Sequence, residues 1–337
     1  MNIQKYSLAL LTSLEKHKNS TATARELKVN QSQVARFLDQ QNNYQSITLE
    51  LAHQLFGQKK VICATDDFGL RRFFSESTEG TSIIVDQTTK SFTMGTKIVA
   101  SGLTDGKYFL PLDLEHWVAE FIVESSYLTK PQLAEKLVLR ILSLGFEIDY
   151  WVFDGLYFTE DFLKFLDDLQ LRFVIKSKTT TLIELNGQMM ALKNCPKLRL
   201  NSNQSTKRIR ASWRNRKWTF SAVRRNGKRG PKVIYLVSNF WTKAKRYAQV
   251  YDGRWKIEKF IRTGKQSLGL ASSMARKANV YLNHIRCVFY AYGMLQLIMK
   301  RFKLDSAEAA LRKVQAFKFK LQESALFDQI SLLVNHA

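Results

Sequence analysis

The stretch Tyr150-Trp151-Val152-Phe153-Asp154, with the two elements that follow it, decides the fold class. Its aromatic and aliphatic residues predict a buried strand that ends at an acidic residue. A helical pattern at Glu160–Leu169 and a second apolar strand at Arg172–Lys176 come next along the chain. A strand, a helix and a strand in this order predict two neighbouring strands of a helix-covered sheet.

Upstream of this stretch, the sequence predicts three consecutive strands, at Ser82–Asp86, Phe92–Ser101 and Lys107–Leu112. Thr104-Asp105-Gly106 is typical of a hairpin turn between the second and the third. Pro131 is expected to open a leucine-rich helix that Gly145 closes. The resulting order, β-β-β-α-β-α-β, predicts a mixed α/β sheet flanked by helices.

The N-terminal region is predicted to be helical. Residues 22–38 combine a small residue inside a first helix, an apolar residue in a turn and helically spaced apolar residues at Val34, Phe37 and Leu38. This pattern is typical of a helix-turn-helix that leaves polar residues outward, although an ordinary helical hairpin has the same pattern.

The composition points to a polyanionic partner. The 337 residues include 52 Lys plus Arg but only 29 Asp plus Glu, which gives a net charge of +23. Such a surplus repels itself unless nucleic acid or an anionic surface neutralises it. The longest apolar run, Val288–Met299, is too short for a membrane span, which needs ~20 residues. Three distant cysteines fit a reducing compartment, so we expect a cytoplasmic protein that does not bind membranes.

The basic charge is concentrated in one segment. Residues 185–251 contain no Asp or Glu, yet they hold seventeen Lys and Arg, interleaved with Trp213, Trp218 and Phe220. The absence of a helical period predicts a β-rich insertion at about 185–240. Cations and aromatic rings together favour phosphate neutralisation and base stacking, so we expect DNA contacts from four arginines of this segment, Arg208, Arg210, Arg214 and Arg216.

A polar stripe follows on the next helix. The spacing of Tyr251, Arg254, Glu258 and Lys265 places all four within about a 60° arc of one helix face. Salt bridges on a solvated face are the plain alternative. Asp86 and Asp154 each end an apolar strand, and together with Glu258 they would supply the hard oxygen ligands that two Mg²⁺ ions need.

These residues resemble a known family. Tyr251-x2-Arg254-x3-Glu258-x6-Lys265 is similar to the Y-R-E-K signature of bacterial insertion-sequence transposases of the DDE class. Asp154-Gly155-Leu156-Tyr157-Phe158 resembles the block around the family's second aspartate, and residues 84–88 resemble the block around its first. Asn283-His284-Ile285-Arg286 is also similar to a family segment.

The resemblance implies an RNase H-like fold interrupted by a basic β-rich insertion. It divides the chain into an N-terminal helical DNA-binding region at 1–75, a catalytic domain at 76–300 and C-terminal helices at 301–337. It also implies a metal site made by Asp86, Asp154 and Glu258, with Mg²⁺ as the ion and Mn²⁺ as a substitute. Tyr251, Arg254, Trp255 and Lys265 would then bind DNA.

The implied activity is cleavage of DNA at the element's ends and transfer of the strand to target DNA by a homodimer on paired ends. The location would be the bacterial nucleoid when DNA is bound. No P-loop occurs, so ATP use is not expected. Two alternatives stay open: a non-catalytic helix-turn-helix regulator, and a metal-dependent nuclease without strand transfer.

Overall fold

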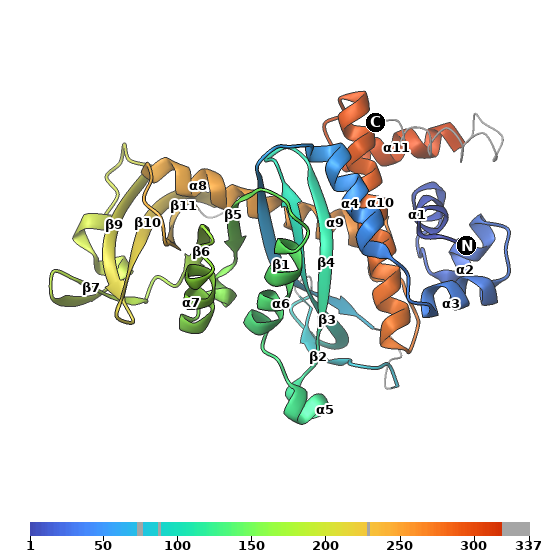
Figure 1. The fold of residues 1–337 in the computed structure, drawn as a ribbon, viewed down its shortest axis with the longest axis horizontal. Helices are drawn as coiled ribbons and strands as arrows, with labels where there is room; N and C mark the ends of the chain where they lie inside the picture. Colours follow the sequence, from blue (N-terminus) through green and yellow to red (C-terminus); the bar gives the residue numbers. More distant parts are fainter. Residues whose placement is uncertain (73–76, 87–88, 228–229, 319–337) are drawn as a thin grey trace.

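The computed structural model describes residues 1–72, 77–86, 89–227 and 230–318. One large mixed sheet runs through the molecule and helices cover it, so the predicted mixed α/β class is confirmed. The sheet order is β2-β3-β1-β5-β6-β11-β10-β9-β7-β8, and β4 also pairs with β3. In Figure 1 the insertion strands lie on the left, the central strands in the middle, and α10 with the N-terminal helices on the right.

The central strands position the candidate site. They are β1 (Val61–Arg71), β3 (Phe92–Thr104), β4 (Phe109–Trp117), β5 (Ile148–Phe153) and β6 (Phe173–Ser177). β1 pairs with β3 antiparallel and with β5 parallel, and β5 pairs with β6 parallel. This arrangement is consistent with the expected RNase H-like sheet.

Buried side chains fix the middle of this sheet. Trp151, Val152 and Phe153 of β5 are all fully buried, because helices cover both faces of the strand. On one face lie α6 (Lys130–Leu142) and α7 (Glu160–Asp168). Thr129 and Gln132 form a reciprocal capping box at the start of α6, and Gly145 takes a positive φ just beyond its end.

A hairpin and short helices complete this part of the chain. The strand β2 (Ser82–Val85) lies at one end of the strand order and pairs with β3. The short elements are α5 (Glu120–Val123), η1 (Glu124–Ser126) and η2 (Gly155–Tyr157).

Strands from the basic segment extend the central sheet. β11 pairs with β6 through Tyr235–Val237, so the extension is continuous with the central strands. The segment comprises β7 (Leu182–Leu185), β8 (Gln188–Ala191), η3 (Leu192–Asn194), η4 (Pro196–Leu198), β9 (Thr206–Trp213), β10 (Arg216–Gly227) and β11 (Gly230–Ser238).

After the extension, the chain returns to the central sheet as helices. They are α8 (Ala244–Tyr251), η5 (Asp252–Arg254), α9 (Trp255–Ser267), α10 (Ala278–Phe302) and α11 (Ala307–Lys318). Residues 319–337 of the predicted C-terminal helices lie outside the described residues.

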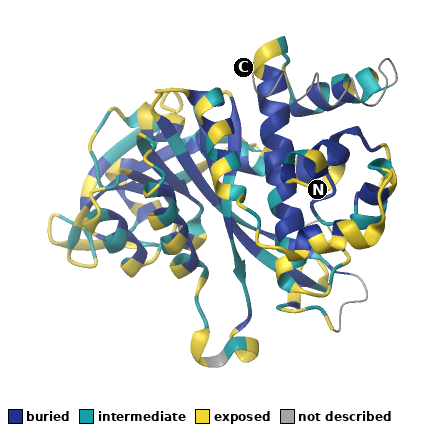
Figure 2. Ribbon diagram, turned by 45° about the vertical axis from the view of Figure 1, so that its right-hand side comes forward, coloured by how far each residue is buried: buried dark blue, intermediate teal, exposed yellow. Residues whose placement is uncertain are grey.

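The N-terminal helices dock on α10. They are α1 (Ile3–Thr12), α2 (Ser20–Glu26), α3 (Gln31–Asp39) and α4 (Tyr44–Phe56). Figure 2 shows α10 as a largely buried rod between the sheet and the helices α1, α2 and α3, whereas α4 lies beside both α10 and β4. The Tyr6 hydroxyl lies 2.7 Å from His284 Nδ1, and His284 Nε2 lies 2.8 Å from the Gly269 carbonyl. Since only a protonated Nε2 can donate to that carbonyl, Nδ1 accepts from Tyr6. Burial lowers the pKa of His284 to about 4 and keeps the ring neutral.

One boundary needs correction. The prediction assigned residues 1–75 to a helical region, yet Val61–Arg71 forms β1, the strand between β3 and β5. The strand expected to be the first of the sheet, Ser82–Asp86, is instead the peripheral β2. The apolar residues of this strand predicted a buried position, but Ile83 is 69% exposed and Val85 is 51% exposed.

Candidate active site

Two adjacent parallel strands deliver the first two carboxylates. Thr65 of β1 is in register with Phe153 of β5, so the next residue on each strand, Asp66 and Asp154, lies at the same level of the sheet. Asp154 then starts the short helix η2. Both backbones are held by largely buried strands in the middle of the sheet.

The third carboxylate comes from α9, together with an arginine just before that helix. The Arg254 guanidinium donates to Asp66 Oδ2 at 2.6 Å through Nη1 and lies 2.5 Å from Glu258 Oε1 through Nη2. Its Nε lies 3.9 Å from Asp154 Oδ1. One cation therefore contacts carboxylates from β1, from the end of β5 and from α9.

Further polar groups surround Asp154. The Tyr251 hydroxyl donates to Asp154 Oδ1 at 3.2 Å, and Lys176 Nζ lies 3.7 Å from the same oxygen. Arg254 also lies over the Tyr251 ring, 5.5 Å from its centroid. Tyr251, Arg254 and Glu258 thus face Asp154 and Asp66 from one side.

Burial shapes the electrostatics of this cluster. It raises the pKa of Asp66 to about 7; Arg254 opposes that rise, whereas Asp154 and Asp67 add to it. Burial alone would lower the pKa of Arg254, but Tyr251, Asp66, Glu258 and Asp154 raise it overall, so the guanidinium stays charged. The cluster is a partly dehydrated, acid-rich site with one permanent cation.

Asp86 does not join this cluster. Its carboxylate lies 3.1 Å from Arg71 Nη1, at the end of β2. Burial lowers the pKa of Lys265, and the nearby Asp86 carboxylate partly opposes that shift. Lys265 lies in the last turn of α9, eleven residues beyond Arg254. Asp86 therefore lies near the C-terminal end of α9, whereas Arg254 and Glu258 lie at its N-terminal end. The structure therefore separates Asp86 from Asp154 and Glu258, and places Asp66 beside them.

The sequence held a signal for Asp66 that the prediction missed. Val61-Ile62-Cys63-Ala64 is an apolar run followed by Thr65 and an acidic pair, Asp66-Asp67. This is the same pattern that singled out Asp154. The two acids point to different partners: Asp66 contacts Arg254, and Asp67 pairs with Lys130 at the start of α6.

The donor set fits a divalent metal. Among the residues that the structure describes, no group of three or more His, Cys, Asp and Glu side chains already has metal-binding geometry. However, Asp66, Asp154 and Glu258 each have a carboxylate oxygen within 4 Å of one cationic group, the Arg254 guanidinium. Carboxylates are the ligands preferred by Mg²⁺ and Mn²⁺.

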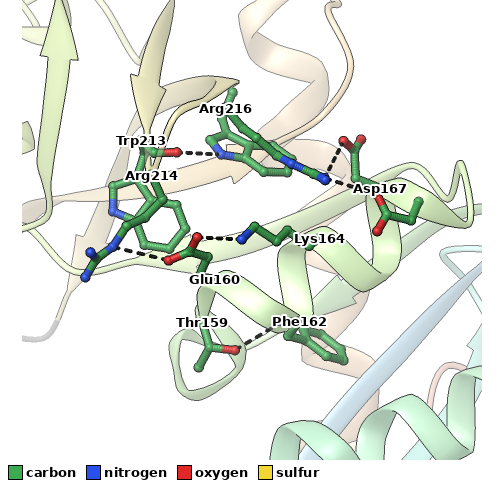
Figure 3. A network of polar contacts seen from close by, with 10 residues as sticks. Thr159, Glu160, Phe162, Lys164, Asp167, Trp213, Arg214 and Arg216 are labelled. Carbon is green, nitrogen blue, oxygen red and sulfur yellow. Dashed lines mark hydrogen bonds and ion pairs between the residues drawn. The ribbon is translucent and has the colours of Figure 1, made fainter.

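The four arginines of the basic segment that were expected to contact DNA fall into two pairs. Figure 3 shows Arg214 and Arg216, around the β9–β10 turn, facing acidic residues of α7. Arg214 lies 3.5 Å from Glu160, and Arg216 lies 3.4 Å from Asp167 and 3.1 Å from Asp168. These two arginines hold the extension against the central part of the chain.

Arg208 and Arg210 have a different environment. Their guanidinium carbons lie 4.1 and 5.5 Å from the centroid of the Trp241 ring, which is 48% exposed. Trp255, at the start of α9, is 55% exposed. On α3, the polar residues expected to face outward are exposed: Gln31, Ser32, Gln33 and Arg36. DNA contact by these residues stays a prediction.

Two of the three carboxylates thus come from adjacent strands of the central sheet and the third from α9. A comparison with protein families identifies the group: residues 121–294 match the family described as "Transposase DDE domain". The match covers more than half of the chain, and the protein belongs to this family. It is therefore a nucleic-acid phosphoryl-transfer enzyme whose family acts on DNA and typically uses a divalent metal.

The family match contains Asp154, Tyr251, Arg254, Glu258 and Lys265, but it begins after both Asp66 and Asp86. The choice between those two aspartates thus rests on the geometry above. A comparison with curated protein sequences gives no significant match. None of the helices in the described ranges is long and apolar enough to cross a membrane.

Proposed function

We propose that the protein is an insertion-sequence transposase that binds the element's ends, cleaves the DNA there and transfers the released 3′-OH strand to target DNA. Asp66, Asp154 and Glu258 form its metal site, with Asp66 in the role first assigned to Asp86. The convergence of these three carboxylates on Arg254 is the observation that carries the proposal.

Each ligand has a distinct structural support. Asp66 and Asp154 are held by buried neighbouring strands, whereas Glu258 lies on α9 and can adjust with that helix. Bound Mg²⁺, or Mn²⁺ in its place, would supply Lewis-acid stabilisation of the charge that develops on the attacking and leaving oxygens. Dehydration of the site strengthens every such interaction.

The cations around the carboxylates would grip the DNA backbone. Arg254 offers a planar fork that matches two phosphate oxygens, and Lys265 provides a point charge farther along α9. Tyr251 would fix Asp154 through its hydroxyl and support Arg254 through its ring. Trp255, Arg208, Arg210 and the exposed Trp241 would extend the DNA contact beyond the site.

The α7 contacts give Arg214 and Arg216 a mainly structural role in this proposal. Two copies of the protein would act together, one on each end of the element. The exposed polar face of α3 would contribute to recognition of the end sequence.

A supercoiled plasmid that carries two cognate ends tests the proposal. Wild-type protein with Mg²⁺ should give products in which the cut 3′ ends are joined to new DNA, and the Asp66→Asn variant should give neither cuts nor joints. Cuts without joining would support the nuclease alternative. Binding without any cut, by wild-type protein as well, would support the regulator.

A further inference from the structure

Arg254 occupies the position that the three carboxylates share. Its two terminal nitrogens approach Asp66 and Glu258 at 2.6 and 2.5 Å, and the side chain is only 12% exposed. The acceptor oxygens in these contacts belong to the same carboxylates that would coordinate metal.

A bound divalent ion and this guanidinium compete for the same three carboxylates. Mg²⁺ requires carboxylate oxygens at ~2.0–2.1 Å in near-octahedral geometry, so metal binding would fix the orientation of these carboxylates. Two like charges within a few ångströms also repel strongly in a dehydrated site. The arrangement seen here therefore has to change when the metal binds.

The third contact of Arg254, to Asp154, is the longest of the three. Its Nε is buried without a hydrogen-bond partner among the described residues, and its 3.9 Å distance from Asp154 is too long for a hydrogen bond. Arg254 also lies at the junction of η5 and α9, over the Tyr251 ring.

We infer that Arg254 is a displaceable cation: it neutralises the three carboxylates before metal binds, and it moves to a DNA phosphate when the metal takes its place. This inference rests on the proposed metal site. Removal of Arg254 from the carboxylates makes room for the ions, and a phosphate is the anion that can receive it. Metal and DNA each then strengthen the binding of the other, since coupling between two sites is reciprocal.

The test is a Mn²⁺ titration followed by electron paramagnetic resonance, first without DNA. Arg254→Gln removes the competing cation, so it should bind Mn²⁺ about tenfold more tightly than wild type, a change of ~1.4 kcal/mol. A pre-cleaved end duplex, which has no bond left to cut, should raise the affinity of wild type for Mn²⁺. The same duplex should change the affinity of Arg254→Gln much less.

Matched variants locate the effect. Arg140 also bridges two carboxylates, Asp113 and Glu115, but on the outer strand β4. Arg140→Gln should leave tight Mn²⁺ binding unchanged. Adding Asp154→Asn to Arg254→Gln should abolish the gain. Thermal unfolding of each variant shows whether it is folded, and Arg254→Lys, which keeps the charge but loses the fork, should fall between wild type and Arg254→Gln.

An unchanged or weaker Mn²⁺ affinity in folded Arg254→Gln would overturn the inference. A different result would contradict the proposed function. It would be contradicted if Asp66→Asn, Asp154→Asn and Glu258→Gln each kept the Mn²⁺ affinity and the cleavage rate of wild type. If those three variants lose Mn²⁺ binding but Arg254→Gln shows no gain, the proposed metal site is supported and only the displacement of Arg254 is rejected.

Discussion

Strands β1 and β2 each present an aspartate near apolar residues, and the two carboxylates are almost equally shielded: Asp66 is 13% exposed and Asp86 is 10% exposed. Their surroundings differ. β1 is paired on both sides and faces two further carboxylates across Arg254, whereas β2 is a peripheral strand whose aspartate pairs with Arg71. Burial therefore does not distinguish the two aspartates, whereas the presence of other carboxylates around the same cation does, and on that difference the proposed metal site rests.

The largest expected difference is in catalysis. Asp66→Asn removes a charged ligand fixed by β1, so cleavage of end DNA should fall by about three orders of magnitude or more. Asp86→Asn should keep cleavage within several-fold of wild type. Single-turnover cleavage of one end substrate gives the rate for both variants. Equal losses of rate would contradict the proposal that Asp66, and not Asp86, is the metal ligand.

The two ends of α9 should separate chemistry from binding. Glu258→Gln keeps the shape of the side chain but removes a ligand charge, so cleavage should collapse while DNA affinity holds or rises slightly, because repulsion from phosphate falls. Lys265→Gln, near Asp86, should weaken DNA binding and leave the three carboxylates in place. Gel-shift affinity and cleavage rate, measured on the same end substrate, test both variants. Cleavage at the wild-type rate by Glu258→Gln would show that Glu258 is not a required metal ligand.

Removal of the arginine beside each aspartate should affect stability unequally. Arg254→Gln leaves three buried or half-buried carboxylates without their shared cation and should cost about 3 kcal/mol in the free energy of unfolding. Arg71→Gln, at a more exposed pair, should cost ~1 kcal/mol or less. Mg²⁺ should restore the melting temperature of Arg254→Gln by binding the folded state, but not that of Arg71→Gln. Equal losses without rescue would contradict a metal site around Asp66.

The smallest predicted effects concern the basic segment. Arg208→Gln with Arg210→Gln should lower the slope of log affinity against log salt by about 2, since each phosphate contact contributes ~0.9. Arg214→Gln with Arg216→Gln should leave the slope unchanged and lower the melting temperature, because contacts with α7 are lost. The opposite outcome would make the β9–β10 turn the DNA-binding surface.

Local patterns in the sequence predicted much of this molecule. The start of α6 near Pro131 and the buried strand ending at Asp154 are properties of short segments, and the structure has α6 and β5 at those positions. The mixed α/β class followed from their order. The single helix expected to carry the polar stripe is divided: Tyr251 lies in α8, Arg254 in η5, and Glu258 and Lys265 in α9.

The position of β1 could not be predicted in the same way, because it depends on pairing with strands far along the chain. Residues 61–71 pair with residues 95–104 and 148–153, and these long-range pairings make β1 a central strand. Ile83-Ile84-Val85 carries a stronger apolar signal, yet it forms a hairpin at one end of the sheet. The sequence therefore singled out Asp86 at the end of the peripheral β2 and passed over Asp66 on the central β1.

The most direct test of the central claim is anomalous diffraction from crystals of the protein bound to a pre-cleaved end duplex and soaked with Mn²⁺. We expect manganese peaks coordinated by the carboxylates of Asp66, Asp154 and Glu258, with the Arg254 guanidinium bound to a DNA phosphate. A peak coordinated by Asp86, with none beside Asp66, would contradict it.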